Sequence, residues 1–199
     1  MPKTHSKEST GKLVLLLGPS GVGKSVILKR LRERHPEMHF PRSATTRERR
    51  PGEGDELYRF VSNTEFDQLL AEGKVLEWAT VHAGARYGTL ADEIVPMIEQ
   101  GKTVIREVDV QGFESIKNHP HFCGEDPQYR LKTIFMLPES KEQLIAHIQK
   151  RAPMEQEELT RRLASMGKEL ARAEECDAQV VNREGRLEET LGEVEKLLV

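Results

Sequence analysis

The stretch Leu13-Val14-Leu15-Leu16-Leu17, followed by Gly18-Pro19-Ser20-Gly21-Val22-Gly23-Lys24-Ser25, decides the fold of this 199-residue chain. The apolar run predicts a buried strand, and helix-forming residues follow the loop. Strand, glycine-rich turn and helix in this order make an anion site, because backbone N–H groups turn inward and the helix dipole attracts negative charge. Lys24 can reach the outer phosphates of a nucleotide, and the Ser25 hydroxyl can hold Mg²⁺. The sequence therefore predicts a nucleoside-triphosphate site; the alternative is a glycine-rich turn before an ordinary helix.

The composition narrows the class of protein. Hydrophobic residues make up 37% of the chain and charged residues 32%, and the net charge is −3. Nothing in this balance points to nucleic acid or to an acidic membrane as a partner. Cys123 and Cys176 form no C-x-x-C pair, so a reduced, cytoplasmic setting is expected. No apolar stretch approaches the roughly 20 residues that span a bilayer. Residues 1–11 are expected to be a disordered tail, and the oligomeric state stays open.

Alternating strand and helix patterns predict an α/β fold with a parallel sheet between two helix layers. The strands expected after the first are Thr103–Val108, Lys132–Met136 and Ala178–Val181. The helices expected are Lys141–Arg151, with a capping box from Ser140 and Gln143, a long helix with Leu159, Leu163, Met166, Leu170 and Ala173 on one stripe, and Leu187–Leu198.

The middle of the chain has small elements of its own and predicts an excursion from the main sheet. Strand-like runs are Leu57–Phe60, Val75–Val81 and Arg86-Tyr87. A helix is expected at Thr64–Glu72, with Thr64 as N-cap and Gly73 just past its end. Thr89 is expected to cap a further helix that runs toward Gln100.

Asp109 directly follows the apolar strand Thr103–Val108. A carboxylate at a strand end beside the phosphate loop can hold Mg²⁺ directly or through water, because Mg²⁺ needs only one or two protein oxygens besides phosphates. The alternative is an aspartate that only ends the strand. Ser25 and Asp109 are therefore the expected metal ligands. The stretch His119–Asp126 contains metal-ligand residue types, but its spacing fits no zinc pattern and indicates a polar loop.

The segment Pro41–Arg50 carries four arginines against one glutamate. A solvated charged run is the ordinary interpretation, yet an ATP site needs no second arginine cluster. Guanidinium groups match phosphate oxygens in bidentate geometry, so the segment predicts a second substrate that bears a phosphate. Tyr58 and Tyr87 can donate their hydroxyls to that phosphate, or can simply be packing residues.

Glu77 lies among apolar neighbours in a strand-like run, where a carboxylate needs a partner. A guanine base offers parallel donors at N1 and N2, whereas adenine has an acceptor at N1 and no N2 amine. Mispairing of this kind can discriminate by roughly 10⁴-fold. A structural ion pair with an arginine is the alternative.

Two basic pairs, Lys150-Arg151 and Arg161-Arg162, flank a charged break at Pro153. Exposed basic segments can close over a triphosphate and exclude water. The alternative is an exposed, salt-bridged helix start.

Together these residues resemble the guanylate kinase family, over nearly everything from Leu13 to the C-terminus. The matching motifs, in chain order, are Gly18 to Ser25, Ser43-Ala44-Thr45-Thr46-Arg47 with Arg50, Pro51-Gly52-Glu53, Tyr58 with Phe60-Val61, Glu77-Trp78, Tyr87-Gly88-Thr89, Asp109-Val110-Gln111-Gly112, Arg151 with Arg162-Leu163, and Val180-Val181-Asn182. Residues that depart from the usual family pattern are Ala44, Thr89, Glu107, His147 and Ala152.

The resemblance implies a P-loop three-layer αβα core at residues 12–42, 90–150 and 163–199, a GMP-binding subdomain at 43–89, and a lid at 151–162. It implies Mg²⁺-dependent transfer of the ATP γ-phosphoryl group to GMP or dGMP. The implied ATP-binding residues are Gly18, Pro19, Ser20, Gly21, Val22, Gly23, Lys24, Ser25 and Asn182. The implied GMP-binding residues are Ser43, Arg47, Arg50, Tyr58, Glu77, Tyr87, Thr89 and Asp109. The implied catalytic residues are Lys24, Arg47, Arg50, Arg151 and Arg162.

Two other classes of function stay open at this point. Some domains of this family are scaffolds that bind phosphopeptides in the GMP cleft, but those usually lack a working phosphate loop. A related kinase acting on a sugar phosphate is the second alternative. Glu77 and Ser43 argue against it, because a sugar phosphate has no guanine to read.

Overall fold

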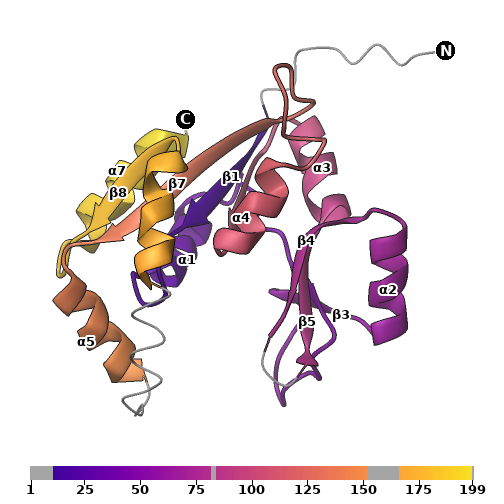
Figure 1. Ribbon diagram of the computed structural model, residues 1–199, viewed down its shortest axis with the longest axis horizontal. Helices are drawn as coiled ribbons and strands as arrows, with labels where there is room; N and C mark the ends of the chain where they lie inside the picture. The colour runs from indigo at the N-terminus through magenta and orange to yellow at the C-terminus, as the bar shows by residue number, and fades with distance from the viewer. Residues whose placement is uncertain (1–10, 82–83, 152–165, 199) are drawn as a thin grey trace. The chain divides into compact units, whose positions relative to one another are not determined.

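The computed structural model describes residues 11–81, 84–151 and 166–198. Strands and helices alternate along most of the chain (Figure 1). The elements are β1 (Lys12–Leu17), α1 (Lys24–Arg34), β2 (Ser43–Thr45), β3 (Tyr58–Phe60), α2 (Asn63–Ala71), β4 (Val75–Thr80), β5 (Arg86–Leu90), α3 (Ala91–Glu99), β6 (Thr103–Glu107), α4 (Val110–Lys117), β7 (Arg130–Pro138), α5 (Lys141–Arg151), η2 (Ala171–Glu175), β8 (Ala178–Asn182) and α7 (Leu187–Leu198). The predicted α/β fold is confirmed.

The strands form two sheets of four strands each. The parallel sheet has the order β6-β1-β7-β8, and the mixed sheet has the order β3-β2-β5-β4. The chain divides into two compact units. One contains the whole mixed sheet, within residues 37–105, together with residues 114–131. The other contains residues 14–36 and 106–113 and the chain from residue 132 onward.

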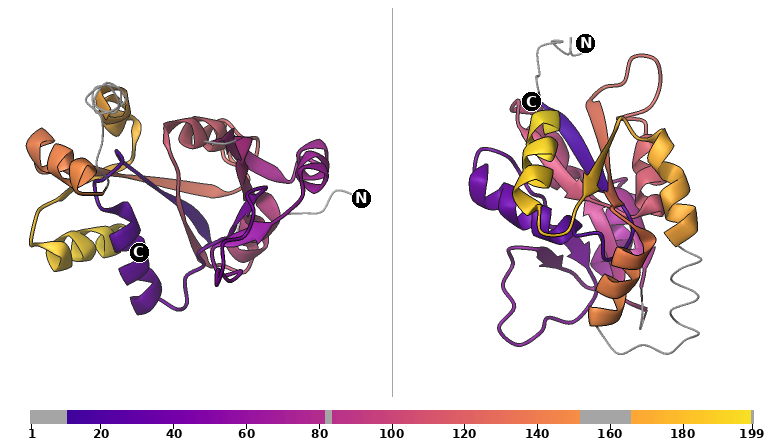
Figure 2. Two further views of the ribbon diagram at one scale, coloured as in Figure 1. Left: turned by 90° about the horizontal axis from the view of Figure 1, so that it is seen from below. Right: turned by 90° about the vertical axis from the view of Figure 1, so that its left-hand side faces the viewer.

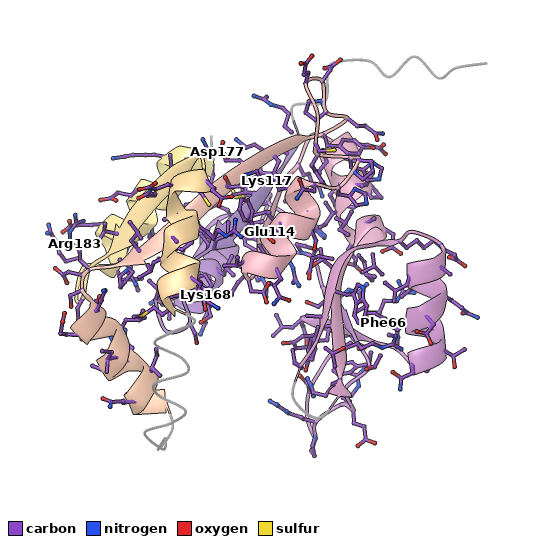
Figure 3. All side chains as sticks on the ribbon, in the orientation of Figure 1. Phe66, Glu114, Lys117, Lys168, Asp177 and Arg183 are labelled. Carbon is purple, nitrogen blue, oxygen red and sulfur yellow. The ribbon has the colours of Figure 1, made fainter. Side chains whose placement is uncertain are left out.

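The strand β1 is buried as its apolar run predicts, since Leu13 to Leu17 are at most 1% exposed. Farther along the parallel sheet, β7 pairs with β8 in the register Ile134↔Ala178 to Pro138↔Asn182. Asp177, labelled in Figure 3, accepts bonds from the backbone N–H and the hydroxyl of buried Thr133, at 2.6 and 2.7 Å. The Asp177 N–H donates back to the Thr133 hydroxyl. These reciprocal bonds fix where β8 enters the sheet.

The helix α7 lies beside both α1 and β8 (Figures 1 and 2). Leu191, Val194 and Leu198 form its buried face, and Ile27 and Leu31 form that of α1. Spacing by three and four residues puts the side chains of each set on one face of their helix, and α7 has the extent predicted from the sequence. Outside the buried faces, Arg34 of α1 pairs with Glu188 and Glu195 of α7.

In the mixed sheet, one face packs against α2. Phe66 points from α2 toward the strands (Figure 3), and it forms a buried cluster with Ala44, Leu69 and Leu90. A Cβ atom on Gly88 would lie 3.1 Å from the Phe66 ring, so a larger residue there would require the ring to shift. The opposite face of the sheet therefore remains for polar side chains.

Two predicted helix caps are wrong. The helix α2 begins after Ser62, not Thr64, because Ser62 and Glu65 form a capping box. Thr89 lies inside strand β5, and α3 begins after Leu90 without a side-chain cap among the described residues. The prediction at Thr89 fails because its hydroxyl bonds across the sheet to Glu77 instead.

Other elements differ from the predictions in their extent. The strand β2 was not predicted, although Ser43, Ala44 and Thr45 are all buried. Residues 166–170 are helical and Ala171–Glu175 form a 3₁₀ helix, so Ala173 does not continue the predicted α-helix. In α5, Ser140 accepts from the Gln143 N–H as predicted, while the Gln143 side chain accepts from Glu139.

The loop between α4 and β7 is ordered by its own aromatic residues. The Tyr129 hydroxyl donates to Glu99 at 2.7 Å and accepts from the Gln128 amide at 3.0 Å. The His121 ring lies 5.5 Å from the Tyr129 ring. Burial and the Glu99 carboxylate raise the pKa of Tyr129 to about 12.

Through residues 11–81, 84–151 and 166–198, each helix is too short or too polar to cross a bilayer.

Candidate active site

The phosphate loop adopts the geometry that its glycines allow. Gly18, Gly21 and Gly23 have φ angles of 138°, 88° and 99°, a region that residues with a Cβ atom avoid. Gly23 is the N-cap of α1, and no described side chain caps that helix. The phosphate loop therefore leads directly into the N-terminus of an 11-residue helix, where the helix dipole favours an anion.

Lys24 extends its ammonium group over this loop. Its Nζ donates to the carbonyl oxygens of Gly18 and Pro19 at 2.5 and 3.2 Å, and it lies 3.6 Å from a Glu107 carboxylate oxygen. The side chain is only 10% exposed. The loop therefore holds a positive charge at the place where the sequence predicts the outer phosphates.

Asp109 lies where the chain leaves β6. The Val108 N–H donates to Leu16 at 3.3 Å, which joins this strand end to β1 just before the phosphate loop. One carboxylate oxygen, Oδ1, accepts from the Gly112 N–H at 2.8 Å. The other can face a ligand.

A pocket of about 370 Å³ adjoins the phosphate loop. Its walls come from the loop, from α1 and α5, and from the turn between β8 and α7. The lining residues are Gly21, Gly23, Val26, Gln143, His147, Asn182, Arg183, Glu184, Gly185 and Leu187. The mixture of two aliphatic side chains with amide and charged groups suits a flat heteroaromatic ring.

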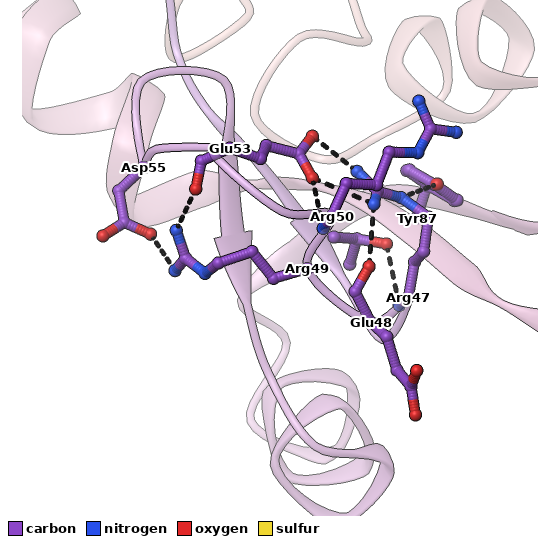
Figure 4. Close-up of polar contacts among 8 residues, drawn as sticks. Arg47, Glu48, Arg49, Arg50, Glu53, Asp55 and Tyr87 are labelled. Carbon is purple, nitrogen blue, oxygen red and sulfur yellow. Dashed lines mark hydrogen bonds and ion pairs between the residues drawn. The ribbon is translucent and has the colours of Figure 1, made fainter.

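Arg47, on the loop after β2, is held by several acceptors (Figure 4). Two of its nitrogens donate to the two carboxylate oxygens of Glu53, at 3.0 and 2.7 Å. Its Nε donates to the Tyr87 hydroxyl at 2.9 Å, and Nη1 also donates to the Glu48 carbonyl at 2.7 Å. Among the described residues, four of the five N–H groups of the guanidinium have an acceptor, which leaves one on Nη2 for a ligand.

Glu53 fixes the conformation of this loop. Besides both Arg47 bonds, it accepts from the backbone N–H of Arg50 at 3.0 Å. The Arg47 guanidinium, and next the Arg50 N–H, lower the pKa of Glu53 to about 2, and Glu53 in turn raises the pKa of Arg47. Since the Tyr87 hydroxyl accepts from Arg47, its own proton is left to donate to an anion.

The other arginines of this segment have different partners. Arg42 pairs with Glu93, and Arg49 pairs with Asp55. Across the described ranges, the guanidinium of Arg50 has no hydrogen-bond or ion-pair partner, and its side chain is exposed. Two of the four arginines are therefore committed to ion pairs outside the Arg47 cluster, and Arg50 can respond to a ligand.

A row of polar residues crosses the open face of the mixed sheet. Ser43 of β2 is the register partner of both Tyr58 on β3 and Thr89 on β5, and Thr89 is also the partner of Glu77 on β4. Register partners share a face of the sheet, so these four side chains line up. Ser43 is 6% exposed and Thr89 fully buried, and the Thr89 hydroxyl donates to the Glu77 carboxylate. Tyr87, two residues before Thr89, lies on the same face.

A protein-family model described as guanylate kinase matches residues 10–199. A guanylate kinase of Thermosynechococcus vestitus is 42% identical over 180 residues, 90% of each protein. One of Nocardia farcinica is 42% identical over 176 residues, 87% of each protein. The crystal structure of guanylate kinase from Anaplasma phagocytophilum is similar with a TM-score of 0.66 at 25% identity, over 96% of this chain and 86% of that one. The present chain belongs to the guanylate kinase family.

For this guanylate kinase family member, the structure brings the predicted site residues into two groups, one in each unit. The phosphate loop, Asp109 and Asn182 lie in one unit. The other unit contains Ser43, Arg47, Arg50, Tyr58, Glu77, Tyr87 and Thr89. Arg162 and most of the predicted lid lie outside the described residues, and so does the side chain of Arg151. The ligand roles and the domain boundaries predicted for this guanylate kinase stay predictions.

No role was predicted for Glu53, although this residue lies in a motif shared with the guanylate kinase family. Its position three residues after Arg50, in an arginine-rich segment, was the available signal. The contacts of His147 and Asn182 with the phosphate loop were not predicted either, because neither residue lies near that loop in the sequence.

Proposed function

We propose that this chain transfers the γ-phosphoryl group of ATP to GMP or dGMP, giving ADP and GDP. The observation that carries the proposal is the polar row on the mixed sheet. The row combines a carboxylate that can read guanine with tyrosines that can bind a phosphate, and Arg47 of the same unit donates to Tyr87 beside them. The phosphate loop alone supports only a nucleoside triphosphate, whereas this row supports a guanine nucleotide as the acceptor.

The donor nucleotide binds at the phosphate loop in this proposal. The N–H groups at the start of α1 and the Lys24 ammonium bind the triphosphate. The adjoining pocket, with Asn182 on its wall, takes the adenine ring. The Lys24 side chain is already positioned by its bonds to Gly18 and Pro19. Little side-chain entropy is therefore lost when its ammonium group exchanges these acceptors for phosphate oxygens.

Kinases of this family generally need a divalent cation. The proposed cation is Mg²⁺, and the residues present fit it. The exposed Ser25 hydroxyl and the second carboxylate oxygen of Asp109 are oxygen ligands of the kind Mg²⁺ prefers. Among the described residues, no cluster of three acidic, histidine or cysteine side chains offers a full cage. Two protein oxygens with phosphates and water are enough for Mg²⁺, which neutralises phosphate charge when bound.

The acceptor nucleotide lies along the polar row. Its phosphate contacts the remaining N–H of Arg47, the guanidinium of Arg50, and the hydroxyls of Tyr58 and Tyr87. Its guanine donates N1–H and N2–H to the Glu77 carboxylate, with Ser43 and Thr89 beside it. Asp109 remains a predicted further contact to this nucleotide.

Transfer needs alignment more than proton chemistry. An oxygen of the GMP phosphate attacks the γ-phosphorus while the bond to the β–γ bridging oxygen breaks, and ADP leaves. The attacking phosphate is already an anion, so no general base is required. Lys24, Arg47 and Arg50 stabilise the charge spread over the transferring group, and Arg151 and Arg162 are the predicted lid cations.

The proposal is tested by a coupled ADP-release assay with ATP and Mg²⁺. The acceptors are GMP, dGMP, AMP, CMP, UMP and ribose bisphosphate. ADP release that depends on GMP or dGMP, with GDP or dGDP as product, supports the proposal. Release that depends on the sugar phosphate, or GMP binding without turnover, contradicts it in favour of the sugar-phosphate kinase or the scaffold.

Replacing Glu77 with leucine should raise KM for GMP by about 10²-fold, because two base donors lose their acceptor. AMP use should stay the same or improve, so the preference for GMP over AMP falls. The Thr89 hydroxyl also loses its acceptor, which costs about 1–3 kcal/mol of stability. Thermal unfolding is therefore measured in parallel, and Glu56→Leu, an exposed carboxylate of the same unit, is the control. An unchanged GMP/AMP ratio in a folded variant would show that Glu77 does not read the base.

A further inference from the structure

Two successive carbonyl groups of the phosphate loop accept hydrogen bonds from side chains on its outer side. The Gly21 carbonyl lies 3.2 Å from His147 Nδ1 on α5. The Val22 carbonyl accepts from Asn182 Nδ2, at the end of β8, at 2.7 Å. Because a carbonyl oxygen only accepts, the His147 Nδ1 carries its proton and the amide nitrogen of Asn182 is the atom that faces the loop.

These bonds fix the orientation of two peptide groups. In a planar trans peptide, the C=O and N–H bonds point in opposite directions. The peptide between Gly21 and Val22 is held at both ends, since its N–H donates to Pro19 at 3.2 Å. In the peptide between Val22 and Gly23, the carbonyl is held by Asn182, so the Gly23 N–H is turned the opposite way, toward the inside of the loop.

The loop has little room to choose another orientation. A Cβ atom on Gly23 would lie 2.5 Å from Asn182 Nδ2. A Cβ on Gly21 would lie 3.2 Å from Ile148 and 3.3 Å from Leu144, both on α5. The end of β8 and one face of α5 therefore pack directly against the loop backbone. Rigid donors on both sides pre-organise the anion site before a ligand binds.

We infer that Asn182 and His147 are positioning residues that hold the phosphate loop in its anion-binding conformation. The inference rests on the proposed function. The rival interpretation is that Asn182 acts on the adenine ring, since both residues line the pocket. The bond to Val22 argues for the loop, because the Asn182 amide nitrogen is committed to a backbone carbonyl.

The two interpretations differ for a ligand without a base. We expect Asn182→Ala to weaken binding of ATP and of inorganic tripolyphosphate by the same factor. The factor is about tenfold, which is the order of the contribution of one hydrogen bond. Asn182→Asp should weaken both at least as much, because a carboxylate repels the Val22 carbonyl. Calorimetric titration with each ligand gives the dissociation constants without depending on turnover.

Gln179→Ala is the matched control. It removes the same kind of amide from the same strand, and that amide donates to Ala173 at 3.1 Å, away from the loop. His147→Ala should also weaken both ligands, and His147→Asn, which keeps a donor at the Nδ1 position, should restore binding to within about threefold. KM for GMP should stay unchanged in all four variants at the two positions, and thermal unfolding shows that each variant is folded.

Three results would overturn the inference. ATP binding weakened while tripolyphosphate binding is unchanged would assign Asn182 to the base. Unchanged binding of both ligands would remove the role altogether. Equal losses in Gln179→Ala would mean that any damage to β8 has the same effect. Failure of the proposed function looks different, because the wild-type chain would then form no GDP whatever the variants do.

Discussion

Lys24→Met should lower kcat for GDP formation by about 10³-fold or more, which corresponds to roughly 4 kcal/mol of transition-state stabilisation. Methionine keeps an unbranched side chain of similar length but has no charge. The variant also loses the bonds to Gly18 and Pro19 in the loop and the ion pair with Glu107 at the end of β6. The effect should therefore fall on kcat and on ATP binding, while KM for GMP changes little.

The matched control for this variant is Lys29→Met, an exposed lysine on the same helix. Its turnover should equal that of the wild type. The coupled assay gives kcat, and calorimetry gives the ATP dissociation constant. If Lys24→Met keeps near wild-type turnover, the assignment of Lys24 to the transferring phosphate is wrong.

Arg50→Met should lower kcat/KM for GMP by about 10³-fold, by analogy with arginines that stabilise phosphoryl transfer in other enzymes. Its guanidinium is exposed, and the described part of the structure gives it no side-chain partner, so its removal should cost little stability. A ligand is therefore where its charge acts.

The neighbouring residue provides a close control. Arg49 has the same side chain on the same loop, but it is paired with Asp55 and donates to the Glu53 carbonyl at 2.9 Å. Arg49→Met should keep kcat/KM for GMP within about threefold, as expected for an exposed ion pair. Equal losses in the two variants would show that the assay reports general loop damage and not phosphate binding by Arg50.

The parts of the fold that depend on local pattern were predictable. The apolar run of β1, the glycine-rich loop and α7 all have their signal within about a dozen residues. The strand β2 was not predictable in this way. Ser43 and Thr45 are polar, and they are buried only because strands far away in the sequence pair with β2 on both sides. For the same reason Thr89, a good helix cap by composition, is a strand residue.

The candidate site shows the same division. Residue chemistry identified Lys24, the arginine segment and Glu77 as candidates, since a charged group in a strand or loop of this kind needs a partner. The alignment of Tyr58, Ser43, Thr89 and Glu77 across four strands needs the sheet register, which no single segment contains. The commitment of Arg47 to Glu53, and of Arg42 and Arg49 to other carboxylates, likewise depends on the folded loop.

The division of labour among these arginines has a consequence for competition by free inorganic phosphate. With Arg42, Arg47 and Arg49 already neutralised by Glu93, Glu53 and Asp55, the cluster presents far less net positive charge than its composition implies. A small anion therefore binds weakly to such a surface, because three of the four guanidinium groups already pair with carboxylates of the protein. Tight binding then requires contacts to the nucleobase as well. Inorganic phosphate at millimolar concentration should therefore compete little with the acceptor nucleotide.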